Sequence, residues 1–141
     1  MLALEFIQAN ESDKSFLMAL RLATMVEHLA REGIYLTAQE HNVRLMDNFA
    51  AYQLIYHDGT LIGAVKFIQN ETEIELMQLQ IAPTYQGQGY GSAVINTLKT
   101  RAAKINLTVL KHNPAFYLYQ QLGFAVTGDD QFEYHMQWCK T

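Results

Sequence analysis

The sequence contains a single cysteine and no hydrophobic run long enough to cross a membrane. Only Cys139 among the 141 residues carries a thiol, which excludes an internal disulfide and suits a reducing compartment. No stretch of about 18 consecutive apolar residues is present. The first residues carry no basic segment and soon reach Glu5, a pattern that predicts a strand rather than a signal peptide. We therefore expect a cytoplasmic protein without a membrane span.

The sequence also lacks an excess of positive charge. Its formal net charge is −4, so we expect neither a nucleic-acid partner nor an anionic membrane surface. The five histidines do not have the spacing of metal ligands, so no metal site is expected. Half of the residues are hydrophobic. The chain is too short for two domains and has no linker, which predicts one domain, residues 1–141, with a sizeable core.

The order of the predicted elements indicates an α/β (α+β) domain with a mixed, mostly antiparallel sheet. Strands are expected at 2–8, 52–56, 61–68, 73–82, 107–111, 124–128 and 132–138, and helices at 12–32, 37–50, 89–104 and 114–122. This gives the order β-α-α-β-β-β-α-β-α-β-β. A helix between strands 73–82 and 107–111 implies a parallel crossover, whereas the turn signal Asp58-Gly59 implies an antiparallel hairpin.

Periodicity predicts the buried faces of the first two helices. The inward residues of the first helix are predicted to be Phe16, Ala19, Leu20, Ala23, Val26 and Ala30, and Gly33 is expected to end it. Thr37 and Glu40 form the capping-box pattern that opens the second helix. Its inward residues are predicted to be Val43, Met46, Phe49 and Ala50.

The most informative segment runs from a strand through three glycines into a helix. Gly87, Gly89 and Gly91 follow Pro83, which ends the strand. Apolar residues then recur at helical spacing at Val94, Ile95, Leu98, Ala102 and Ile105. Glycine lets the backbone approach a ligand closely, and the unpaired N–H groups and dipole of a helix N-terminus favour an anion. The segment therefore predicts a phosphate-bearing ligand, although it lacks the lysine of a P-loop and the acid of a dinucleotide fingerprint.

A second segment joins a helix cap to a short helix. Asn113 is a favourable N-cap residue, and Pro114 suits the first helical position because it has no N–H to leave unpaired. Gly123 suits the left-handed position that ends a helix.

Together, the two segments resemble the GNAT superfamily of acyl-CoA-dependent N-acetyltransferases. Residues 86–91 match its Q/R-x-x-G-x-G/A signature, and residues 113–124 match its N-x-A…Y-x-x-x-G-F segment, in the same order and separation. The resemblance implies a GNAT-type fold in which the two central parallel strands splay apart and CoA lies between them. It also implies acetyl-CoA as co-substrate and a primary amine of a small molecule, peptide or protein as acceptor.

The resemblance further implies roles for individual residues. The CoA-binding residues it implies are Leu79, Gln80, Ile81, Gln86, Gly87, Gln88, Gly89, Tyr90, Gly91, Ser92, Asn113, Phe116 and Tyr119. Among these, the backbone N–H groups of residues 79–81 would polarise the thioester carbonyl as an oxyanion hole. Tyr119 would lie near the CoA sulfur, and its phenol, protonated at neutral pH, could donate a proton to the leaving thiolate.

The group that takes the proton from the amine stays open at this point. Glu75 stands six residues before Ile81, the offset at which some family members carry a catalytic strand Glu, and the alternative is a path through ordered water. The resemblance also implies that the acceptor lies by the first two helices, their connecting loop and the last strands, which here gives Glu27, Glu32, Tyr35, Glu40, Tyr134 and Trp138; carboxylates and aromatic rings of this kind could hold an ammonium group.

Two other functions stay open. One is a module of the same fold that binds and senses acyl-CoA without turnover, and the other is an interaction domain that has lost its ligand. The sequence names neither the acceptor nor the oligomeric state, and a homodimer is compatible with it.

Overall fold

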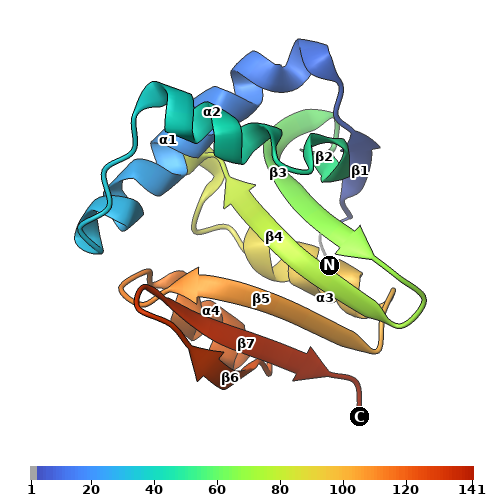
Figure 1. Ribbon diagram of the computed structural model, residues 1–141. Helices are drawn as coiled ribbons and strands as arrows, with labels where there is room; N and C mark the ends of the chain where they lie inside the picture. Colours follow the sequence, from blue (N-terminus) through green and yellow to red (C-terminus); the bar gives the residue numbers. More distant parts are fainter. Residues whose placement is uncertain (1–2) are drawn as a thin grey trace.

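A seven-stranded sheet organises the computed structural model, which describes residues 3–141 (Figure 1). Its strands are β1 (Glu5–Gln8), β2 (Tyr52–His57), β3 (Thr60–Gln69), β4 (Glu73–Ile81), β5 (Lys104–Leu110), β6 (Ala125–Asp129) and β7 (Glu133–Cys139). The helices are α1 (Lys14–Arg31), α2 (Ala38–Met46), α3 (Tyr90–Lys99) and α4 (Ala115–Gln121). The predicted order of elements is confirmed, while Leu2 of the first predicted strand lies outside the described residues.

The sheet is mixed, as predicted. Its strand order is β1-β2-β3-β4-β5-β7-β6. Only β4 and β5 pair in parallel, because α3 carries the chain back across the sheet between them. The hairpin between β2 and β3 turns at Asp58 and Gly59, whose φ values of 49° and 78° are those of the two-residue turn that the sequence predicts.

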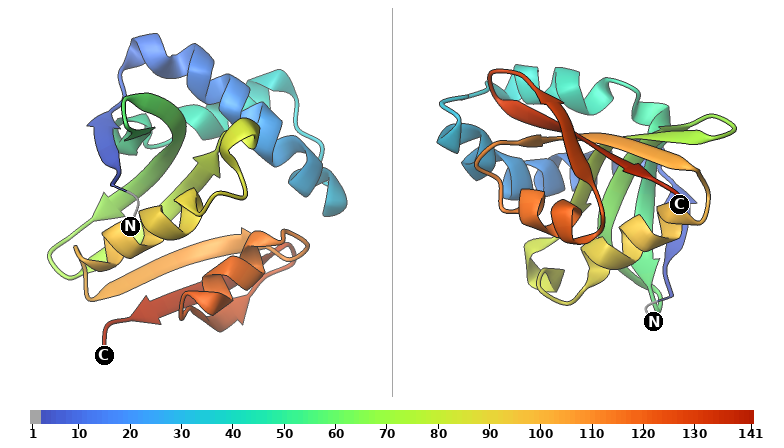
Figure 2. Two further views of the ribbon diagram at one scale, coloured as in Figure 1. Left: turned by 180° about the vertical axis from the view of Figure 1, so that it is seen from behind. Right: turned by 90° about the horizontal axis from the view of Figure 1, so that it is seen from below.

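The helices cover the sheet in two pairs, α1 and α2 on one face and α3 and α4 on the other (Figure 2). The larger core lies under α3 and α4, where Val94, Ile95 and Leu98 pack against strand residues such as Val65 and Leu107. The smaller core lies under α1 and α2. No helix in the described part of the chain is both long and apolar enough to cross a bilayer.

The predicted buried face of the first helix is wrong by about one residue position. Of that face only Leu20 is buried, and Val26 is 44% exposed. The buried side chains of α1 are Leu17, Leu20, Arg21 and Leu29. Apolar residues occur at helical spacing on more than one side of α1. Periodicity therefore does not predict that the buried side is the one that contains an arginine.

The second helix also differs from its prediction. The capping box of Thr37 and Glu40 forms, but the helix ends at Met46, and Val43 is 63% exposed. His41 and Leu45 are buried instead. The buried ammonium of Lys66, from β3, donates to the carbonyls of residues 44, 45 and 47 at the end of the helix, which binds these otherwise unpaired groups.

The helix after the glycine segment is shorter than predicted. It ends at Lys99 and not near residue 104, and Ile105, which the helical pattern included, lies in β5. Parallel pairing with β4 begins at Lys104. The strand therefore takes residues whose apolar spacing also fits a helix.

Candidate functional site

The two parallel strands separate after four paired residues. The segments 73–76 and 104–107 pair, whereas β4 continues to Ile81 and β5 to Leu110. In β4 Met77 is an extra residue, because Lys66 and Phe67 of β3 pair with Gln78 and Leu76, and such a bulge bends the strand. From Met77 onward the edge of β4 that faces β5 has no strand partner, and Figure 1 shows the two ribbons diverging.

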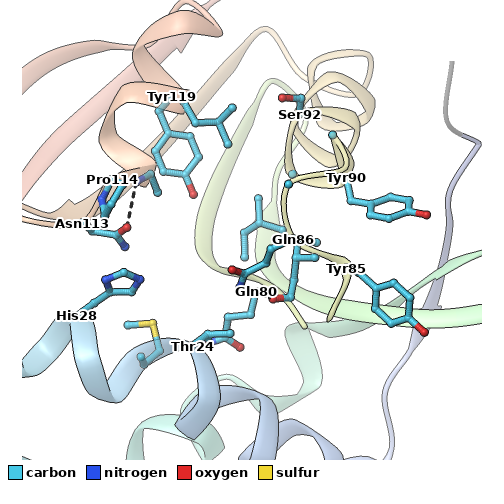
Figure 3. Close-up of a pocket in the computed structure, with 18 residues that line it drawn as sticks. Thr24, His28, Gln80, Tyr85, Gln86, Tyr90, Ser92, Asn113, Pro114 and Tyr119 are labelled. Carbon is cyan, nitrogen blue, oxygen red and sulfur yellow. Dashed lines mark hydrogen bonds between the residues drawn. The ribbon is translucent and has the colours of Figure 1, made fainter. Parts of the chain in front are cut away.

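A cavity of about 520 Å³ opens where the strands separate, and we name it the glycine-loop cavity. Eleven of the predicted site residues line it (Figure 3): Leu79, Gln80, Ile81, Gln86, Gly87, Gly89, Tyr90, Gly91, Ser92, Asn113 and Tyr119. The other predicted CoA-binding residues are not among its lining. Gln88 donates its side-chain amide to the carbonyl of Thr84, and Phe116 lines a smaller cavity with Tyr134.

The glycine loop presents backbone and not side chains to this cavity. Gly87 and Gly89 have φ values of 77° and 87°, which L-residues other than glycine rarely adopt. Gly89 begins α3 without a side-chain cap, so the first N–H groups of the helix are available to an anion. The amide of Gln86 donates to the carbonyl of Ile81 over 2.9 Å and ties the loop to the end of β4.

Tyr90 anchors the loop from behind. Its hydroxyl hydrogen bonds to Nδ1 of His57 over 2.9 Å, and its ring, like that of Tyr85, points away from Asn113 and Tyr119 (Figure 3). Gly63 of β3 allows this strand to lie close to β4, because a Cβ placed on it would lie 2.2 Å from the carbonyl oxygen of Gln80. The close approach of β3 to the site-bearing part of β4 therefore depends on this glycine.

The β5–α4 connection supplies the opposite wall. Oδ1 of Asn113 accepts a hydrogen bond from the N–H of Ala115 over 3.0 Å, but the N-cap of α4 is Pro114, so the predicted start of the helix is one residue early. Gly123 follows the helix with a φ of 94°, as predicted. Tyr119 is only 8% exposed, and its ring packs on Phe124. Burial raises the pKa of Tyr119 to about 12, so its phenol stays protonated at neutral pH.

Two polar side-chain atoms on residues that line this cavity have no hydrogen-bond partner within residues 3–141. They are Nδ1 of His28, on α1, and Oε1 of Gln80, on β4, and both are inaccessible to solvent. Burial and the charge of Arg31 lower the pKa of His28, which favours the neutral ring. In Figure 3 the His28 ring points toward Asn113, on the same side of the cavity as Tyr119.

A second cavity of about 500 Å³ lies beside the first, and we name it the α2-side cavity. Met25, Leu79, Asn113 and Tyr119 line both cavities. The charged residues that line the α2-side cavity are Arg44, Asp47, Lys66 and Glu133. Sequence reasoning missed all four, although a lone lysine within the apolar run of β3 was a usable signal.

The carboxylates that the sequence singles out lie elsewhere. Glu75 is exposed in the paired part of β4, opposite Asn106, and lines neither cavity. Glu27 pairs with Arg31 on the surface of α1. The proposed acceptor residues Glu32, Tyr35, Glu40, Tyr134 and Trp138 also line neither cavity.

Two of these acceptor residues have structural partners instead. Glu32 accepts hydrogen bonds from the backbone and ring of His112, and Glu40 completes the capping box of α2 with Thr37. Within residues 3–141 no cluster of three or more His, Cys, Asp or Glu side chains could hold a metal ion.

Comparison with solved structures identifies the fold. The PaiA N-acetyltransferase of Thermoplasma acidophilum, solved in complex with coenzyme A, superposes with a TM-score of 0.74 at 18% identity, over 98% of this chain and 99% of that one. An acetyltransferase of Thermus thermophilus superposes with a TM-score of 0.76 at 19% identity, over 98% of this chain and 97% of that one. Naa50 of Arabidopsis thaliana, in complex with the bisubstrate analogue CoA-Ac-MVNAL, gives 0.67 at 17% identity, over 96% and 98% of the two chains.

Two comparisons used the sequence, one with curated proteins and one with family models. The search of curated proteins finds no match. The family model described as "Acetyltransferase (GNAT) domain" matches residues 23–140, a span that includes the glycine loop, both cavities and Tyr119. The chain therefore belongs to the GNAT acetyltransferase family.

Proposed function

We propose that the chain transfers an acetyl group from acetyl-CoA to a primary amine of a small molecule, peptide or protein. The observation that carries the proposal is the meeting of three features at one cavity: the unpartnered edge of β4, the uncapped N-terminus of α3 and the buried phenol of Tyr119. Each feature answers one need of the reaction, namely a carbonyl to polarise, phosphates to hold and a thiolate to protonate.

The loop residues 87–92 would hold the CoA pyrophosphate by their backbone N–H groups, since anions are favoured at a helix N-terminus. The free edge of β4 would pair with the pantetheine arm as it would with a neighbouring strand. Oδ1 of Asn113 is engaged by the N–H of Ala115, which leaves its side-chain N–H groups as donors toward the arm.

The chemistry needs two groups beside the thioester. The N–H groups of residues 79–81 are proposed to donate to the carbonyl oxygen as negative charge develops on it. Tyr119 is proposed to give its proton to the sulfur as the C–S bond breaks. A pKa of about 12 keeps the phenol protonated at neutral pH, so it can donate a hydrogen bond to the sulfur as negative charge develops there.

Two side chains are candidates for taking the proton from the amine. Glu75, which the sequence favours, lines neither cavity and would act only through ordered water. His28 lines the glycine-loop cavity with Tyr119. Because its Nδ1 is closed off from solvent, its Nε2 would be the atom that takes the proton. A neutral imidazole is a competent base near pH 7, so we propose His28 as the nearer acceptor of this proton.

The test is release of free thiol from acetyl-CoA over a panel of amines, polyamines, amino acids and lysine peptides, with the amine-free rate subtracted. We expect thiol release that depends on the amine and matches the amount of N-acetyl product. CoA should also raise the melting temperature, since a hundredfold excess over Kd adds about 2.7 kcal/mol. Stabilisation by CoA without thiol release for any amine would favour a sensing module instead.

A further inference from the structure

The α2-side cavity has two walls of different charge. Arg44 and Lys66 lie on the α2–β3 wall, and Glu133 lies on the β7 wall, where its Oε2 accepts a hydrogen bond from Thr108 over 3.0 Å. Asp47, the other charged lining residue, follows α2 on the same wall as the cations. Because Tyr119 lines both cavities, the α2-side cavity opens at the atoms that the proposed reaction uses.

Two cationic side chains are buried behind the exposed surface of the α2–β3 wall. Lys66 is 2% exposed, and its ammonium lies 2.6 Å from the carbonyl oxygen of Asp47. Arg21 is 1% exposed and donates to Nδ1 of His41 over 3.0 Å. Within the described chain no carboxylate oxygen lies within 4.0 Å of either cation. Carbonyls at the end of α2 bind the Lys66 ammonium, and the charge of Asp47 acts on it from beyond this distance. Neither cation has a carboxylate in direct contact, so their field favours an anion nearby.

Arg44 is the part of this wall that a ligand can reach. Its side chain is exposed, and no carboxylate among residues 3–141 forms an ion pair with it. Glu40, one turn earlier on α2, is held by Thr37, and Asp47, three residues later, lines the same cavity without forming an ion pair with Arg44. The guanidinium is therefore available as a planar fork, the geometry that binds a carboxylate through two hydrogen bonds.

We propose that the α2-side cavity binds a primary amine that also carries a carboxylate, that is, a free amino acid. Its carboxylate lies against Arg44, and its amine points toward Leu79 and Tyr119. This inference rests on the proposed function, because it names the class of acceptor for the same reaction. The cavity volume of about 500 Å³ is within the range of small-molecule pockets.

The same wall disfavours a polyamine. A second ammonium group placed against Arg44 would meet the charges of Arg44, Lys66 and Arg21, and like charges repel most strongly where water is scarce; only a position near Glu133, on the β7 wall, would avoid them. An amine whose carboxylate is removed or amidated would lose the contact with Arg44 and gain nothing in return. The charge of the acceptor therefore decides its affinity more than its length does.

The test compares a set of amino acids with their amides and with the matching decarboxylated amines as acceptors. Wild-type kcat/KM should be highest for members with a free carboxylate. In Arg44→Gln the KM for the preferred amino acid should rise about tenfold to a hundredfold, as expected for loss of a charged hydrogen-bonding partner, with kcat within about threefold. The amide and the amine should change little. Arg101→Gln removes an exposed arginine that lines neither cavity; it is the matched control and should leave every acceptor unchanged.

Charge reversal sharpens the test. Arg44→Glu should prefer the decarboxylated amine over the amino acid. The inference is overturned if the wild type uses the amide or amine as well as the amino acid, or if Arg44→Gln weakens all three equally. If no acceptor is acetylated while CoA still stabilises the fold, the proposed function fails and this inference fails with it.

Discussion

Replacement of Tyr119 by phenylalanine tests the proposed proton donor without disturbing the core around it. The ring is 8% exposed and packs on Phe124 with centroids 5.8 Å apart, and phenylalanine keeps that packing. The hydroxyl makes no hydrogen bond within residues 3–141 that its removal would leave unpaired. Tyr119→Phe should therefore fold normally, with a melting temperature within a few degrees of the wild type.

The expected loss lies in kcat. General acid catalysis typically contributes about 10²–10⁴-fold, and we expect the lower end, about 10²-fold, because a thiolate is a better leaving group than most. That corresponds to about 2.7 kcal/mol of transition-state stabilisation. KM for acetyl-CoA should change little, because backbone groups of the glycine loop would carry most of the binding. Thiol release under single-turnover conditions measures the chemical step directly.

A matched control lies on the same helix. Tyr117 is 66% exposed, so Tyr117→Phe should keep full activity. If Tyr119→Phe turns over within about twofold of the wild type while chemistry is rate-limiting, Tyr119 is a packing residue. The thiolate would then leave unprotonated or take its proton from water.

Three further predictions follow from the same geometry. Gly63→Ala should destabilise the fold by about 1–3 kcal/mol and weaken CoA binding, because its Cβ would lie 2.2 Å from the carbonyl oxygen of Gln80. The control Gly128→Ala, whose Cβ would meet nothing within 4 Å, should change neither the melting temperature nor the CoA titration. Burial lowers the pKa of His28 below its usual value near 6.5. Wild-type kcat/KM should therefore fall only as the pH drops below about 6.5. In the same pH range, protonation of the buried ring destabilises the native state. His28→Gln should be slow at every pH and lack this acid limb, and an unchanged profile would rule out His28 as base. Glu75→Gln should have a pH–rate profile from 6 to 9.5 that parallels the wild type; a loss centred near neutral pH and rescued at high pH would restore Glu75 as the base.

Much of the fold could be predicted because its signals are local. The turn at Asp58 and Gly59, the capping box at Thr37 and the glycine after α4 each depend on the conformation of a few residues. The glycine loop is local too, since its positive φ values and its free helix N-terminus are adjacent in sequence. The GNAT resemblance added the splayed strands, which no periodicity indicates.

The sequence did not predict features that depend on contacts between residues far apart in the chain. The apolar stripe of α1 gave no hint that Arg21 would be buried, because its partner His41 comes from another helix. The α2-side cavity joins residues of α2, β3 and β7, so its charges are far apart in sequence. Likewise, the offset of Glu75 from Ile81 does not indicate that this part of β4 is still paired with β5.

The central claim is that CoA lies between β4 and β5, with its phosphates on the glycine loop and its sulfur beside Tyr119. A crystal structure of the chain with CoA tests it most directly. We predict that the pyrophosphate contacts the backbone N–H groups of residues 87–92, and that the sulfur lies in contact with the Tyr119 hydroxyl. A pantetheine arm that lies outside the gap between β4 and β5, or a pyrophosphate bound away from this loop, would contradict the account.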